Sequence, residues 1–271
     1  MDWSLVLASQ DIEHTIESTD EAWLLVISDV DVERAAAAIR AYEQENATVW
    51  RHEVKWTGLL FDWRSVFWWV FVVFMFLLST GSRPELREQG VFNSVRFLHG
   101  EWWRAVTAVT LHADAAHIAL NTATGLLLLG LVMGCFGAGR GLLVSLLCGA
   151  GANAIEAGLQ PKGYNGLGAS GMVMASLGLL AAQSMFERHT SAREWIGRGV
   201  IAAFLLFTLI GFDVKSDILA HLLGFVNGMV CGVGICLVDR QLKGRPAIDL
   251  AAAIFAAALV GTSWALAIRA G

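Results

Sequence analysis

Long apolar segments constrain this chain more than any other feature. They lie at residues 65–82, 115–137, 142–159, 170–186, 196–212, 218–238 and 248–268. Each is close to the ~20 residues that a membrane-spanning helix needs. The whole chain is 56% hydrophobic and only 16% charged, which is too apolar for an ordinary soluble domain. We therefore predict an all-α polytopic membrane bundle.

The N-terminal part has a different composition. Residues 1–60 carry 4 Lys or Arg and 12 Asp or Glu, a net charge of −8, against +3 for the remainder. Strand-like runs at 5–9, 23–28 and 48–54 alternate with helical stretches at 11–17 and 32–45, which predicts a small α/β head of βαβαβ type. The expected organisation is a small acidic α/β cytosolic domain, a juxtamembrane linker, a six-helix core and an additional C-terminal transmembrane helix, at residues 1–55, 56–64, 65–240 and 241–271.

The charge pattern also predicts an orientation. Residues 1–10 lack the basic start and apolar core of a signal peptide, so we expect the head to stay in the cytoplasm. With the head inside, 12 Lys or Arg fall on cytoplasmic segments and 7 on external ones, in agreement with the positive-inside rule. This predicts a multi-pass protein of the cell membrane. No basic surface suggests a nucleic-acid partner, and the four cysteines, all in apolar runs, are expected to be buried free thiols: Cys135, Cys148, Cys231 and Cys236.

Residues 83–110 form a long insert between the first two apolar segments. The insert contains charged and prolyl residues but also Phe92, Phe97, Trp102 and Trp103. It is too polar to span a membrane and too aromatic for a plain solvated loop. We expect an interfacial, partly embedded structure.

Two apolar segments each carry a polar side chain that could take part in catalysis. Ser170 lies in GLGASGMVMASLG (residues 166–178), and His221 lies in AHLLGFVNG (residues 220–228). A serine hydroxyl needs a base to become a good nucleophile, and a histidine is the usual one. Small residues one turn apart would let these two helices meet closely: Gly171, Ala175 and Gly178 on one, Ala220, Gly224 and Gly228 on the other.

A third polar group lies in TLHADAAHIALN (residues 110–121), where His117 and Asn121 are four apart and share a helix face. Each group also has a structural reading. A serine beside glycine is common helix packing, and a histidine or asparagine can simply tie helices together by hydrogen bonds. Intramembrane polar residues are costly, however, and three sets at similar depth favour a functional site.

These motifs resemble those of the rhomboid intramembrane serine proteases. The matching stretches are GEWWR at 100–104, HADAAHIALN at 112–121 with the spacing HxxxxHxxxN, GASG at 168–171, and AHLLGFVNG at 220–228. They occur in the family's order over about residues 65–238. The head lies outside the resemblance, and so does the last apolar segment, which resembles the extra C-terminal helix of some members.

The resemblance implies a serine endopeptidase that cleaves transmembrane proteins in or near their membrane segments. Ser170 would be the nucleophile and His221 the general base, without an acidic third member. His117, Asn121 and the backbone N–H groups of Ser170 and Gly168 would form the oxyanion hole, in a site open toward the external face. Trp103, Arg104 and His112 would be structural residues of a membrane-embedded loop, and residues 196–212 would gate substrate access. Neither a cofactor nor a metal is expected. The chain departs from many members at Met174, where an aromatic residue would stack on the histidine.

Other functions fit the sequence less well. A metalloprotease would need a motif such as HExxH, which is absent. An aspartyl intramembrane protease needs two membrane aspartates, whereas Asp213 and Asp217 lie in one loop. A transporter would predict internal repeats, and none is found. The serious alternative is a catalytically weak or inactive rhomboid-like protein that binds transmembrane helices, although such proteins usually lose the serine or the histidine.

Overall fold

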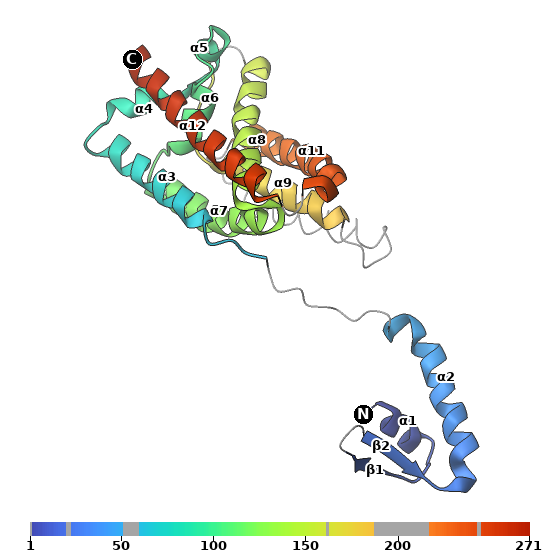
Figure 1. Cartoon of the computed structure of the whole chain (residues 1–271). Coiled ribbons are helices and arrows are strands. Elements are labelled where there is room, and N and C mark those ends of the chain that lie inside the picture. The colour runs from blue at the N-terminus through green and yellow to red at the C-terminus, as the bar shows by residue number, and fades with distance from the viewer. Residues whose placement is uncertain (1, 20–22, 51–59, 161–162, 187–216, 243–244) are drawn as a thin grey trace. The chain divides into compact units, whose positions relative to one another are not determined.

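The structure is a computed structural model, and it describes residues 2–19, 23–50, 60–160, 163–186, 217–242 and 245–271. The chain divides into two compact units, Met1–Trp56 and Thr57–Gly271 (Figure 1). The first is a small mixed unit and the second is a helical bundle.

The first unit is built around one β-hairpin. Helix α1 (Asp2–Ser9) precedes the antiparallel strands β1 (His14–Ser18) and β2 (Trp23–Ile27), in which His14 pairs with Ile27. A 3₁₀ turn, η1 (Asp29–Asp31), leads into helix α2 (Val32–Trp50). Leu7, Ile12 and Ala35 form its small buried core.

The secondary structure predicted for the N-terminal unit is correct for its central elements and wrong for the elements before and after them. The strand at 23–28 and the helix at 32–45 are confirmed as β2 and α2. The expected strand at 5–9 is helix α1, the expected helix at 11–17 is largely strand β1, and residues 48–50 of the expected third strand belong to α2, the rest lying outside the described residues. A short apolar run does not distinguish helix from strand. Strand β2 needs a partner, and Thr15 and Ile16 give β1 the β-branched residues that suit pairing.

The second unit contains helices that fit a membrane. It comprises α3 (Ser65–Thr80), the insert, α7 (Ala115–Phe136), α8 (Ala138–Leu159), α9 (Ser170–Phe186), α11 (Ile218–Leu242) and α12 (Pro246–Ala270). Four of them, α7, α8, α11 and α12, are long and apolar enough to span a bilayer, and α3 and α9 are apolar but shorter. The protein is therefore a multi-pass membrane protein. The predicted segment at 196–212 lies outside the described residues.

One face of α3 is apolar and exposed. Phe67, Val70, Phe74 and Leu77 recur at helical spacing on this face. In water such a stripe would be costly, whereas in a bilayer it is the surface that lipid covers. The exposed apolar face of α3, like the apolar composition of the helices, therefore indicates a membrane environment.

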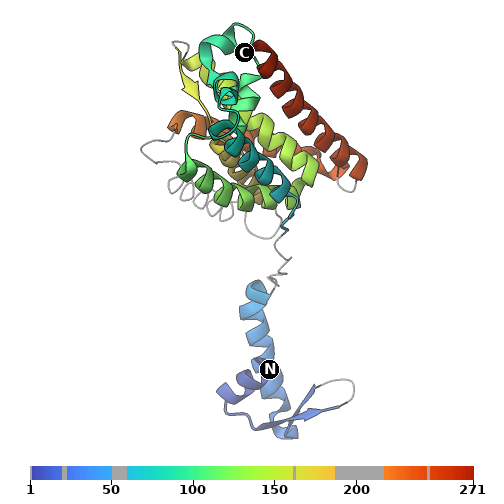
Figure 2. The ribbon, with the colours of Figure 1, turned by 90° about the vertical axis from the view of Figure 1, so that its left-hand side faces the viewer.

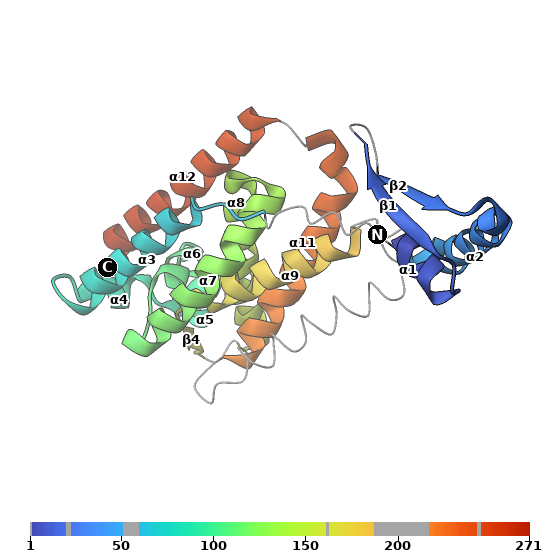
Figure 3. The same ribbon diagram turned by 90° about the horizontal axis from the view of Figure 1, so that it is seen from below.

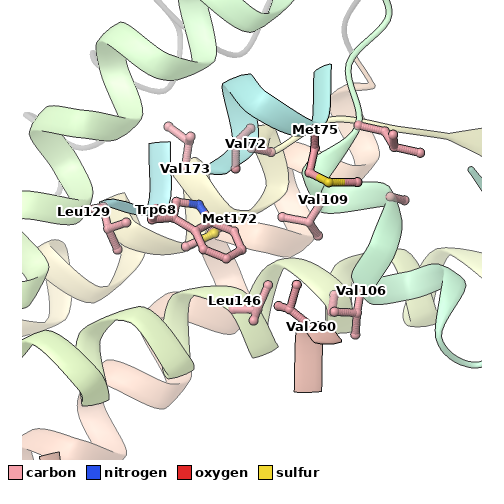
Figure 4. Packing of buried hydrophobic residues seen from close by; sticks show 14 of the residues in the cluster. Trp68, Val72, Met75, Val106, Val109, Leu129, Leu146, Met172, Val173 and Val260 are labelled. Atoms are coloured by element: carbon pink, nitrogen blue, oxygen red, sulfur yellow. The ribbon is translucent and has the colours of Figure 1, made fainter. Parts of the chain in front are cut away.

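The insert folds as a set of short elements packed on the bundle. These are α4 (Glu85–Gly90), β3 (Phe92–Asn93), α5 (Ser94–Leu98), α6 (Arg104–Thr107) and the 3₁₀ turn η2 (Ala108–Thr110). Figure 4 shows Val106 and Val109 of the insert in one cluster with Trp68 and Val72 of α3 and with Met172 of α9. The insert is thus part of the core of the bundle.

Helix α9 has its most extensive contacts with α11, and Figure 3 shows the two side by side. Helix α8 contacts both of them. Helix α12 runs along one side of the bundle, against α8 and the insert (Figure 2). A second short strand, β4 (Asn165–Gly166), pairs antiparallel with β3 and so joins the segment before α9 to the insert.

Candidate active site

Ser170 is the first residue of α9 and is half-buried. The carbonyl of the preceding residue, Ala169, already accepts a helical hydrogen bond from the N–H of Val173 at 2.9 Å. The first N–H groups of a helix lack intrahelical partners and carry the positive end of its dipole. The backbone at Ser170 is therefore suited to stabilise a negative charge.

The loop before Ser170 is fixed from two sides. The N–H of Gly168 donates to the carbonyl of Ala108 at 3.0 Å, and the N–H of Ala169 donates to Nε2 of His112 at 3.3 Å. Gly168 has a φ of +134°, and a Cβ added there would lie 2.7 Å from Cε1 of His117. Glycine is thus required at 168 both for its backbone conformation and for its close approach to the His117 ring.

His221 lies in the first turn of α11 and is 4% exposed. Its N–H donates to the carbonyl of Asp217 at 3.0 Å, and the side chain of Asp217 accepts the N–H of Ala220 at 3.0 Å. Asp217 therefore caps the helix that carries His221. Both predicted residues of the dyad thus stand at the N-terminal end of a helix.

Backbone contact joins these two helices. A Cβ added at Gly224 would lie 2.3 Å from the carbonyl oxygen of Gly171, and one added at Gly228 would lie 2.0 Å from that of Ala175. Gly171 follows Ser170 directly, and a Cβ on it would lie 3.9 Å from the carbonyl oxygen of Ala220, the neighbour of His221. The glycines thus bring the starts of α9 and α11 together.

His117 and Asn121 lie on α7, one turn apart. Asp114 caps this helix by accepting the N–H of His117 at 2.9 Å. The His117 ring lies against Gly168, with its centroid 5.0 Å from that of His112. Asn121 is 5% exposed, and its Nδ2 donates to the carbonyl of His117 at 3.1 Å. The structure therefore brings His117 to the loop before Ser170, and Asn121 lies one turn further along the same helix.

Arg104 holds the insert together from inside. Its side chain is almost fully buried, forms an ion pair with Glu101, and donates through Nη1 to the carbonyls of Glu88 at 3.1 Å and Val91 at 2.9 Å. Beside it, the hydroxyl of Thr107 donates to the carbonyl of Gly90 at 2.7 Å. The adjacent Trp103 packs against the main core. These contacts stabilise the turns that lead to His112.

Burial lowers the pKa of His112 to about 3, with a smaller contribution from the neighbouring His117. Its imidazole is therefore neutral at ordinary pH, and in the tautomer with the proton on Nδ1 its Nε2 can accept the Ala169 N–H. Met174 is fully buried in the main core. Among the described residues, no group of three or more His, Cys, Asp or Glu side chains is arranged to hold a metal ion.

Sequence reasoning missed several polar contacts close to this site. Tyr164 donates its hydroxyl to the carboxylate of Asp217, and Glu156 is fully buried beside them. Asn227, within the His221 motif, donates to the carbonyl of Cys148 at 3.2 Å. Glu156 and Asn227 lie within apolar helices, where polar residues usually have polar partners, and this position could have indicated that such contacts exist.

Comparison with known proteins identifies the family. The Rhomboid domain matches residues 99–238, which is just over half of the chain. The chain belongs to the rhomboid family. It is 30% identical over 147 residues to the rhomboid protease GluP of Bacillus subtilis, an alignment that covers 54% of this chain but only 28% of GluP. It is 28% identical, again over 147 residues, to the putative rhomboid protease YdcA of the same organism, covering 54% of this rhomboid and 72% of YdcA.

Proposed function

We propose that this rhomboid is an intramembrane serine endopeptidase, which hydrolyses peptide bonds in or near the transmembrane segments of other membrane proteins. The observation that carries the proposal is the glycine contact between α9 and α11, since it joins the helix starts that bear Ser170 and His221. Membership of the rhomboid family supports the same reaction.

In the proposed mechanism, the hydroxyl of Ser170 attacks the scissile carbonyl while His221 takes its proton. The tetrahedral intermediate collapses when His221 returns the proton to the leaving amine. The acyl group on Ser170 is then hydrolysed by a water molecule that His221 activates in turn. Water must therefore reach the site, which favours a cavity open to the outside of the membrane.

The oxyanion would be stabilised by donors that are already in position. We assign this role to the N–H of Ser170 at the start of α9, to His117 and to Asn121. An amide has two N–H donors, so Asn121 retains one after its bond to the His117 carbonyl. The N–H of Gly168 already donates to the carbonyl of Ala108, so we do not count it as an oxyanion donor. We assign Gly168 a different role, which is to leave room for the His117 ring because it has no side chain. Removing one such donor typically costs about 3–4 kcal/mol of transition-state stabilisation.

The positive-inside pattern supports a cytoplasmic head and a site toward the external face of the cell membrane. Residues 1–55 would then be a cytosolic domain, 65–240 the catalytic core, and 241–271 an additional transmembrane helix. The partners would be transmembrane protein substrates and the lipid bilayer.

The proposal is tested with the full chain in proteoliposomes that also contain a reporter protein with one transmembrane helix. Wild type should cleave the reporter, whereas Ser170→Ala and His221→Ala should not. Ser184→Ala is the matched control, because Ser184 lies on the same helix and its hydroxyl donates within that helix, to the carbonyl of Ala181 at 2.8 Å. Cleavage by Ser170→Ala at the wild-type rate would overturn the proposal, and binding of the reporter by wild type without cleavage would favour the non-catalytic alternative.

A further inference from the structure

Tyr164 and Asp217 connect the segments that lead to Ser170 and His221. The hydroxyl of Tyr164 donates a hydrogen bond to Oδ2 of Asp217. Tyr164 lies six residues before Ser170, and Asp217 lies four residues before His221. The bond therefore links the loop before Ser170 to the start of α11, the helix that carries His221.

The Tyr164 end of the bridge is firmly held. Its carbonyl accepts the N–H of Ser94 at 2.9 Å, and its ring centroid lies 6.2 Å from that of the fully buried Phe92. The next two residues form strand β4, which pairs with β3 of the insert. Burial, followed by the hydrogen bond to Asp217, raises the pKa of Tyr164, so the phenol keeps the proton that it donates.

The Asp217 end acts directly on the helix of His221. Oδ1 accepts the N–H of Ala220 at 3.0 Å, and the backbone carbonyl accepts the N–H of His221 at 3.0 Å. Oδ2 is the atom that accepts from Tyr164. One residue thus caps α11 and ties it to the Tyr164 loop, and its negative charge stands where the helix dipole favours it.

Glu156 completes the cluster from α8. Its side chain is fully buried, lies beside the side chains of Asp217 and Tyr164, and accepts a hydrogen bond from Nε2 of Gln160 at 2.8 Å. This places two carboxyl groups and a phenol side by side. Such an arrangement is expensive in an apolar bundle, and the proposed dyad makes no use of it.

We propose that Tyr164, Asp217 and Glu156 are positioning residues, which fix the start of α11 against the loop before α9 and so set His221 relative to Ser170. We assign them an effect through the two helix starts and not through contact with the substrate. The effect on reactivity rests on the proposed function, whereas the effect on the two helix starts does not.

The test uses the full chain in detergent and two measurements. The first is hydrogen–deuterium exchange at residues 217–222 and 163–171, and the second is the second-order rate at which a fluorophosphonate labels Ser170. Tyr164→Phe should increase exchange in both segments and slow labelling by about 10-fold to 100-fold, as expected for a small misplacement of a reacting group. Tyr42→Phe, which removes a hydroxyl from the other compact unit, should change neither.

The partner variants separate positioning from a general loss of folding. Asp217→Asn keeps one oxygen for the helix cap, and its side-chain NH2 can donate to the Tyr164 oxygen, so the two side chains stay bridged and the labelling rate should stay within about threefold of wild type. Asp217→Ala also loses the helix cap, so it should be slowed at least as much as Tyr164→Phe. The double variant should be no slower than Asp217→Ala alone, because both changes break the same bridge. The melting temperature of each variant is measured to identify any that fail to fold.

Unchanged exchange in Tyr164→Phe, or losses that multiply in the double variant, would overturn the proposal. So would a normal labelling rate in Tyr164→Phe despite increased exchange. A wild-type protein that is not labelled at all would instead contradict the proposed function, and the exchange data would still decide whether the bridge orders the two helix starts.

Discussion

Nε2 of His112 accepts the N–H of Ala169 at 3.3 Å, and both residues are buried. This bond joins the end of the insert to the residue directly before Ser170. His112→Ala would leave the Ala169 N–H buried without its acceptor, which costs about 1–3 kcal/mol. We expect a lower melting temperature in detergent for His112→Ala and a smaller loss for His112→Gln, whose side-chain oxygen can accept the same bond. Equal stability of His112→Ala and wild type would contradict this role.

The low pKa of His112 predicts a dependence of stability on pH. Its pKa is about 3 in the folded protein and about 6.5 in an unfolded chain. Between these values the unfolded state binds a proton that the folded state does not, so stability is complete above pH 6.5 and falls as the pH is lowered. The slope from one such group reaches about 1.4 kcal/mol per pH unit. Thermal unfolding from pH 7.5 to 5 should therefore show a steeper loss for wild type than for His112→Gln, and parallel curves would refute the assignment.

The glycines between α9 and α11 predict a position-specific effect of one methyl group. A Cβ at 228 would lie 2.0 Å from the carbonyl oxygen of Ala175, which is backbone and cannot move aside cheaply. Gly228→Ala should destabilise the protein by about 1–3 kcal/mol or more, the usual cost of overpacking, and should reduce cleavage by separating the two helices. Gly234→Ala is the control on the same helix, because no described atom lies within 4 Å of a Cβ there. If both variants melt at the same temperature, the close contact is not present.

The C-terminal helix caps another helix across the bundle. Oδ1 of Asp249 on α12 accepts the N–H groups of Gly139 at 3.1 Å and Arg140 at 3.0 Å, at the start of α8. Asp249→Ala should cost about 1 kcal/mol, as for the loss of a helix cap, and Asp249→Asn should retain most of the stability. The measurement is thermal unfolding in detergent, with exchange at residues 138–141 as a local probe. A change in exchange elsewhere but not at these residues would contradict the capping role.

The sequence predicted those parts of the structure that depend on long apolar patterns. The segments at 115–137, 170–186, 218–238 and 248–268 correspond to α7, α9, α11 and α12 within a few residues. Lipid requires a continuous apolar stretch with all backbone groups paired, so hydropathy alone identifies such helices. Of the candidate site, the small residues on α9 and α11 were likewise predicted to pack, because close backbone approach needs glycine or alanine.

Contacts between distant residues could not be predicted in this way. Nothing near Asp249 in the sequence indicates that it caps α8, and nothing near Trp264 indicates that its indole N–H donates to Thr110 at 3.2 Å. In the head, the apolar run at 5–9 was equally compatible with helix and strand, and the burial of Leu7 against Ile12 and Ala35 decides for the helix. Tertiary packing overrides local preference at such positions.

The most direct test of the central claim is to label the detergent-solubilised protein with a fluorophosphonate and to locate the adduct by mass spectrometry. We expect one adduct, on Ser170, which is absent from Ser170→Ala and His221→Ala and retained in Ser184→Ala. An adduct on another residue, or undiminished labelling of Ser170→Ala, would show that Ser170 is not the nucleophile.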